Sequence, residues 1–126
     1  MIGLVVNKLL KDSSALFALV GLKIYPYAIE EDDTLPGVLY RVISSEPEYD
    51  KSGIVEESNE VEVLVYAKTY ANCLSIAKEI RSALEFKKGD VDGIYVSSCR
   101  VQKISEDYDF SQNIYFSTVN FLIITQ

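Results

Sequence analysis

The hydrophobic pattern changes its period within residues 61–84, and this change constrains the fold more than any other feature of the sequence. Up to Lys68, in VEVLVYAK, apolar and polar residues alternate, as in a strand with one covered face. From Thr69 onward, in TYANCLSIAKEIRSAL, apolar residues recur every three or four positions, as in an amphipathic helix that ends near Glu85. The sequence therefore predicts a strand that runs into a helix, with Thr69 as its N-cap, and a helix that folds back over the sheet.

The strongest strand patterns form two long hairpins on either side of this helix. Lys-Ser-Gly at 51–53 supplies the turn of the first hairpin, and residues 110–113 turn the second. The first tip, roughly 46–58, is charged and carries little apolar surface, so we expect it to project beyond the core. The apolar run at 121–124 has no polar face, which is typical of a central strand. The four long strands are expected at 37–50, 54–68, 94–109 and 114–125.

Strict alternation in the third of these strands assigns its residues to two faces. Ile94, Val96 and Ser98 are expected on one face. The other face is expected to carry Tyr95, Ser97 and Cys99.

The N-terminal third predicts two helices and a short strand. An apolar stripe over residues 2–11 indicates a helix, and a second short helix follows a break at Asp12 and Ser13. Gly21 stands where a left-handed residue would end that second helix. The following short strand should lie at a sheet edge, because Pro26 has no amide donor. Four acids at 30–33 lie on consecutive residues, whose side chains diverge, so we interpret them as a solvated loop.

These elements predict one domain over residues 1–126 in the α+β class, with the order α-α-(β)-β-β-α-β-β. The expected sheet is mainly antiparallel, with about four long strands and with helices packed on one face. The segments "KKGD" and "DG" before the third long strand are expected to be turns.

Composition argues against most enzyme classes and against DNA binding. The chain has 12 basic and 19 acidic residues, a net charge of −7, so it lacks the cationic excess that phosphate binding requires. It has no histidine and no phosphate-binding glycine motif, and we expect no cofactor and no metal. No apolar run is long enough to span a membrane, and no targeting segment is visible. We therefore expect a soluble, cytosolic protein that is not an enzyme.

Several reactive side chains have a simpler interpretation than catalysis. Cys73 on the predicted helix and Cys99 on a predicted strand are expected to be reduced and partly buried. The run Ser97-Ser98-Cys99 is interpreted as sheet packing. The carboxylate pairs Glu56/Glu57 and Asp107/Asp109 lie in polar segments, without the apolar pocket that a general acid requires.

The hairpins carry the candidate contact residues. Long strands expose unpaired backbone groups at the edges of a small sheet, and assemblies pair or cover such edges. Nine tyrosines, several near strand ends, are suited either to interfaces or to the rim of the core. From polarity and position, we expect contacts at the first hairpin tip, through Glu46, Tyr49, Asp50, Lys51, Glu56 and Glu57, and at the second turn, through Asp107, Tyr108, Asp109 and Phe110.

The order of several segments resembles a known family. "ALVGLKIYPYAI" follows a helical start, then "LPGVLYRVIS", the strand–helix segment at 61–84, "VSSCRVQKISEDYDF" and the closing "IYFSTVNFLIIT". This arrangement, over nearly the whole chain, resembles the tail completion (head–tail joining) proteins of long-tailed phages and prophages, which are related to tail terminators.

The resemblance implies a structural subunit of the virion tail, made in the bacterial cytoplasm, with helices packed on a curved sheet. It implies a homo-oligomeric ring, possibly a hexamer, that contacts a tail-tube protein and a head-connector protein. A ring with an acidic lumen would let DNA pass without binding it. Two alternatives stay open: a bacterial α+β adaptor or binding module unrelated to phage assembly, and a small enzyme.

Overall fold

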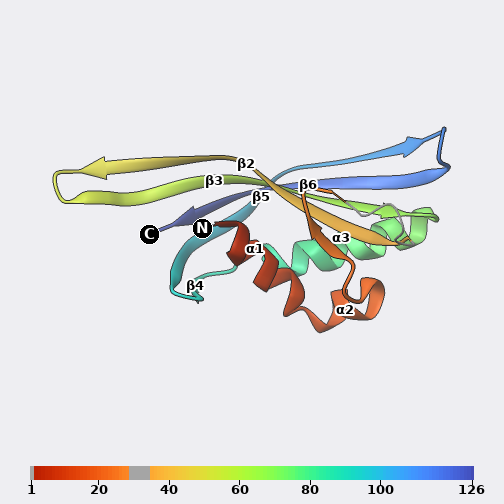
Figure 1. Ribbon diagram of the computed structural model, residues 1–126, viewed down its shortest axis with the longest axis horizontal. Helices are drawn as coiled ribbons and strands as arrows, with labels where there is room; N and C mark the ends of the chain where they lie inside the picture. The colour runs from red at the N-terminus through yellow and green to blue at the C-terminus, as the bar shows by residue number, and fades with distance from the viewer. Residues whose placement is uncertain (1, 29–34) are drawn as a thin grey trace.

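The computed structural model describes residues 2–28 and 35–126, and in these residues it contains three helices and one six-stranded sheet (Figure 1). The acidic run at 30–33 lies outside the described residues. The helices are α1 (Ile2–Lys11), α2 (Ser14–Val20) and α3 (Tyr70–Leu84). The strands are β1 (Ile24–Pro26), β2 (Gly37–Asp50), β3 (Gly53–Ala67), β4 (Gly89–Val91), β5 (Ile94–Asp109) and β6 (Ile114–Thr125).

The strand order is β1-β2-β3-β6-β5-β4. The four long strands are antiparallel to one another, as expected, and β6 lies between β3 and β5 near the centre of the sheet. The prediction of a short edge strand near Pro26 is confirmed by β1, whereas the three-residue strand β4 at the other edge was not predicted. The edge strand β1 pairs with β2 in parallel, so the described sheet is mixed.

The other short edge strand, β4, replaces an expected turn. Asp92 and Gly93 have positive φ angles of 48° and 87°, which is the backbone of a two-residue hairpin connection. This connection folds the chain back, so Gly89–Val91 pairs with the start of β5. The segment "KKGD" is therefore partly a strand, and only "DG" is a turn as expected.

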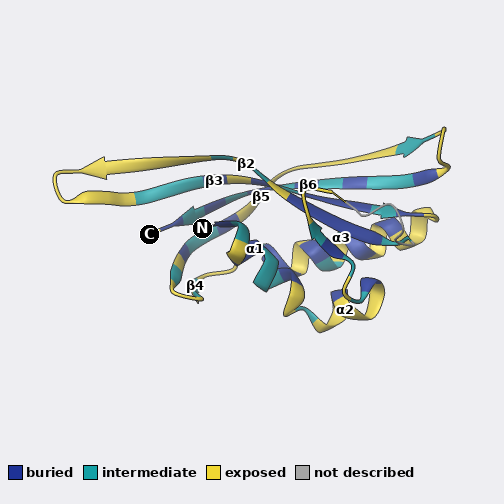
Figure 2. Ribbon diagram, viewed as in Figure 1, coloured by how far each residue is buried: buried dark blue, intermediate teal, exposed yellow. Residues whose placement is uncertain are grey.

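All three helices cover one face of the sheet (Figure 1). Alternate residues of β3 and β6 point into this layer, and α3 packs against both strands. Burial follows the two hydrophobic periods (Figure 2). The fully buried side chains from strands and helices include Val61, Val63, Val65, Val119, Phe121, Ile123, Leu10, Leu16, Ile76, Ile80 and Leu84.

The helix ends explain why the chain turns where it does. Thr69 and Ser13 cap α3 and α2, because each side-chain oxygen accepts a hydrogen bond from the amide three residues later, at 3.2 Å. Gly21 ends α2 with a φ of 62°, but its ψ is −129°. The prediction of a left-handed residue was therefore right in φ and wrong in ψ.

The alternation predicted for β5 was wrong at its start. Val96 and Cys99 are both buried, although strict alternation would separate them. The register with β6 shifts between Val96 and Ser98, as at a β-bulge, and the extra residue turns Cys99 to the helix-covered face.

The two long hairpins project in opposite directions from the covered part of the sheet (Figure 1). The tip of the β2–β3 hairpin is largely exposed, as expected from its composition (Figure 2). The fold thus places a compact core at the middle and two extended arms at the ends. The first arm is the projecting part of the β2–β3 hairpin, and the second arm is that of the β5–β6 hairpin.

Candidate functional site

The turn of the β2–β3 hairpin is built by Asp50. Its Oδ1 accepts hydrogen bonds from the amide and the hydroxyl of Ser52, both at 2.7 Å, and these bonds lower the pKa of Asp50. Tyr49 and Lys51 stand exposed beside it, Tyr49 with 69% of its surface in solvent. The predicted contact residue Asp50 therefore shapes the turn, while Tyr49 and Lys51 are free to meet another molecule.

The remaining predicted residues of this hairpin point to both sides of the sheet. Glu46 pairs with Ser58 and Glu48 with Glu56, so two like charges lie directly opposite each other. By register these residues lie on the face away from the helices, whereas Glu57 lies on the helix side. Glu56 and Glu57 therefore do not form a carboxylate pair that could act on one substrate.

Asp109 builds the turn of the β5–β6 hairpin in the same way. Its Oδ1 accepts from the amide and hydroxyl of Ser111, at 2.9 and 2.6 Å, and from the amide of Gln112 at 3.3 Å. The bonds from Ser111 and Gln112 lower the pKa of Asp109. Asp107 accepts a bond from the amide of Tyr108 at 2.8 Å. Both acids are therefore engaged in local backbone structure.

A row of aromatic rings packs along the β5–β6 hairpin and connects it to the helix layer. The rings of Tyr70 and Tyr115 have centroids 5.6 Å apart, and Tyr108 packs against Tyr115 at 4.7 Å and Phe110 at 4.9 Å. The Tyr70 hydroxyl donates to Glu106 Oε2 at 2.6 Å. Phe110 ends the row with 85% of its surface exposed. The row fixes the direction of the arm and presents an apolar ring at its tip.

The predicted contact residues thus form two groups at opposite ends of the sheet (Figure 1), and one copy of the chain does not bring them together. Sequence reasoning missed a positive group near the start of β5. Lys87 and Lys88 line a shallow pocket with Phe86 and Arg100, and Lys103 follows on the same strand. The double lysine was visible in the sequence, but its position beside Arg100 depends on the β4 hairpin.

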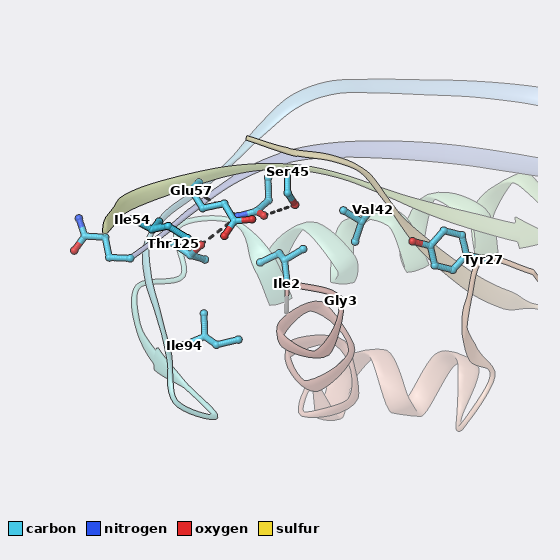
Figure 3. A pocket seen from close by; sticks show the side chains of 11 residues that line it. Ile2, Gly3, Tyr27, Val42, Ser45, Ile54, Glu57, Ile94 and Thr125 are labelled. Atoms are coloured by element: carbon cyan, nitrogen blue, oxygen red, sulfur yellow. Dashed lines mark hydrogen bonds between the residues drawn. The ribbon is translucent and has the colours of Figure 1, made fainter. Parts of the chain in front are cut away.

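A groove of about 580 Å³ opens where the first arm leaves the core (Figure 3). The groove is lined by apolar and polar side chains. The apolar ones include Ile2, Val42, Ile54 and Ile94, and the polar ones include Glu57 and Thr125. Among the described residues, no three potential metal ligands gather here or elsewhere. Among the described lining residues, the hydroxyls of Ser45 and Thr125 bond to Asn59, which is not a base, so the groove shows no nucleophile activated by a base.

The two cysteines are free and buried, as the sequence suggested. Desolvation by burial raises the pKa of Cys73, and it raises the pKa of Cys99 to about 12. A thiol with a raised pKa is a poor nucleophile, so both cysteines act as packing residues. None of the described helices is long and apolar enough to cross a bilayer.

Comparison with known proteins relates this arrangement to phage particles. A chain in the virion of a native gene transfer agent particle has the same fold, with a TM-score of 0.74 at 16% identity over 95% of this chain and 90% of that chain. No curated protein matches by sequence. The family model of the tail completion protein gp17 matches residues 5–126, which is nearly the whole chain. The chain therefore belongs to the family of the tail completion protein gp17, and it is a structural component of a phage-type virion tail.

Proposed function

We propose that the chain is a non-enzymatic ring subunit that closes the tail tube and joins it to the head connector. The observation that carries this proposal is the arrangement of two arms on opposite sides of one core, each exposing a strand edge. The unpaired backbone groups of such an edge can bond to a strand of another chain, and monomeric proteins normally shorten or cover these edges. Family membership supports the same role.

The charge of the chain suits a ring through which DNA passes. A net charge of −7 per copy repels the phosphate backbone, and a closed ring multiplies this field around its channel. The genome can then pass without binding. Since nucleic-acid binding proteins need a cationic surface, this composition favours a passage over a DNA-binding site.

The arm tips are the candidate contacts with the axial partners. Tyr49 and Lys51 at one tip and Phe110 at the other are exposed, and the neighbouring Asp50 and Asp109 hold the turns that present them. An exposed aromatic ring on a fixed turn is a typical anchor of a protein interface. We assign these tips to the tail-tube protein and the head connector.

Negative-stain electron microscopy tests this function. The purified chain is imaged alone and mixed with the tail-tube protein of the same particle. The proposal predicts rings, either free or seated on tube ends, and tubes that stop growing when the chain is added. A chain that stays monomeric and leaves tube length unchanged would refute the proposed function.

A further inference from the structure

Each edge of the sheet has a long stretch with no strand on its outer side. The short strand β1 covers β2 only as far as Tyr40, so among the described residues the outer edge of 41–50 is free. On the other side, β4 covers β5 as far as Val96, and the Phe86 amide donates to the Cys99 carbonyl. Among the described residues, no strand pairs with the outer edge of 100–109 either. The two free edges have equal lengths.

Charge is distributed along the two free edges in the same order. Each edge has its positive charge at the start and its negative charges toward the end. The β2 edge carries Arg41, then Glu46, Glu48 and Asp50. The β5 edge carries Arg100 and Lys103, then Glu106, Asp107 and Asp109. If two such edges pair in parallel, Arg41 meets the basic start of β5, and the acidic ends of the two strands meet each other. If they pair antiparallel, the acidic end of β2 meets the basic start of β5, and Arg41 meets Asp107 and Asp109.

Most of these charges lie on the same face of the sheet. Glu46 pairs with Ser58 on β3, Arg100 with Leu122 and Lys103 with Asn120 on β6. The neighbours of Leu122 and Asn120 along β6 are the core residues Phe121 and Val119, so Leu122 and Asn120 face away from the helices. The opposite charges of two paired edges would therefore be near each other and not on opposite faces of the joined sheet.

Of the edge charges, Arg41 is the one that takes part in an ion pair within the described part of the chain. The ion pairs among the described residues join Lys8 to Asp12, Arg41 to Glu62 and Arg81 to Glu85. None of these ion pairs includes Glu46, Glu48, Arg100 or Lys103. Glu48 lies opposite Glu56 on β3, so its nearest cross-strand neighbour carries the same charge. Lys87 and Lys88, beside Arg100, extend the positive end of the β5 edge.

We propose that the free edge of β2 in one copy pairs antiparallel with the free edge of β5 in a second copy, with Glu46 and Glu48 against Lys103 and Arg100. This inference rests on the proposed ring, for which it names the subunit contact. The two surfaces differ, so the contact is heterologous and repeats from copy to copy until the ring closes. Backbone hydrogen bonds supply the affinity, and charge order sets the direction. Pro47 removes one amide donor at most from this edge.

Charge reversal in pairs tests the contact. One variant carries Glu46→Lys and Glu48→Lys, a second carries Arg100→Glu and Lys103→Glu, and a third carries all four changes. Lys68→Glu with Lys78→Glu is the matched control, because both lysines are exposed and lie off the two edges. Far-ultraviolet circular dichroism and thermal melts confirm that each variant folds. Sedimentation velocity, alone and with the tail-tube protein, reports assembly.

The wild type, the control and the four-change variant are expected to assemble, while each two-change variant loses assembly. An equimolar mixture of the two defective variants is expected to assemble again, because each offers the edge that the other now matches. Amides of 41–50 and 100–109 should gain hydrogen-exchange protection in the assembled wild type. Two-change variants that assemble like the wild type would overturn this contact and leave the ring intact. A wild type that never assembles, with or without the tube protein, would refute the ring itself.

Discussion

Asn59 joins three strands where the first arm leaves the core, and an aspartate there gives a sharp test of the packing. Its side chain is only 1% exposed. The Nδ2 group donates to the Ile123 carbonyl at 3.0 Å and to Thr125 Oγ1 at 3.3 Å, and Oδ1 accepts from Ser45 Oγ at 2.7 Å. These bonds link β2, β3 and β6, so the amide holds the register of the arm.

Asn59→Asp keeps the shape but replaces the donor by an oxygen that faces the Ile123 carbonyl. Burial and this repulsion raise the pKa of the new carboxyl in the folded state above the roughly 3.9 of an unfolded aspartate. As pH rises above about 4, the unfolded state loses its proton first, so the free energy of unfolding falls until the pH passes the folded pKa. A buried charge without a compensating partner costs about 3–5 kcal/mol, and we expect a loss near the lower value at pH 7. The protonated acid can still donate, so at pH 4 the loss should be about 1 kcal/mol.

The assay is urea unfolding between pH 4 and pH 7, followed by tyrosine fluorescence, since the chain has no tryptophan. Asn59→Ala is the control: it removes the same bonds and should cost about 1–3 kcal/mol with the same pH dependence as the wild type. If the aspartate variant showed no extra dependence on pH, the site would be hydrated, and the buried amide would not hold the arm.

Three further predictions concern packing and capping. Cys99 should resist maleimide in the native state at pH 8 and react after urea is added, and native labelling as fast as in urea would contradict this. The free energy of unfolding should fall above about pH 9, because the unfolded thiol ionises before the folded one. Thr69→Ala should cost about 1 kcal/mol in urea unfolding through loss of the α3 cap, whereas Thr69→Ser should keep most of the stability. Phe121→Ala should cost about 3–5 kcal/mol, because the ring is fully buried on the central strand, and a loss below about 1 kcal/mol would contradict the described core.

Long periodic segments were predictable from the sequence because their pattern repeats many times. The change of period at Thr69, the stripe of α1 and the alternation of β3 each extend over several turns or pairs, and the structure confirms them. A strand of three residues has no such repetition, so the sequence predicts only a turn at "KKGD", where β4 begins. The bulge between Val96 and Ser98 depends on pairing with β6 and leaves no mark on the local pattern.

The exposure of the two hairpin tips was predictable from polarity, but their positions relative to each other were not. Residues such as Tyr49 and Phe110 could be placed at turns from the sequence alone. That the two turns lie at opposite ends follows from the strand order, with β6 inserted between β3 and β5. The free edges likewise exist only because β1 and β4 stop short, which no local pattern records.

Cryo-electron microscopy of purified particles tests the central claim most directly. We predict one ring of this chain at the head-proximal end of the tail, with neighbouring copies in contact through their sheets. Particles that lack the chain, or that carry it as separate copies along the tail without contact between them, would contradict the account.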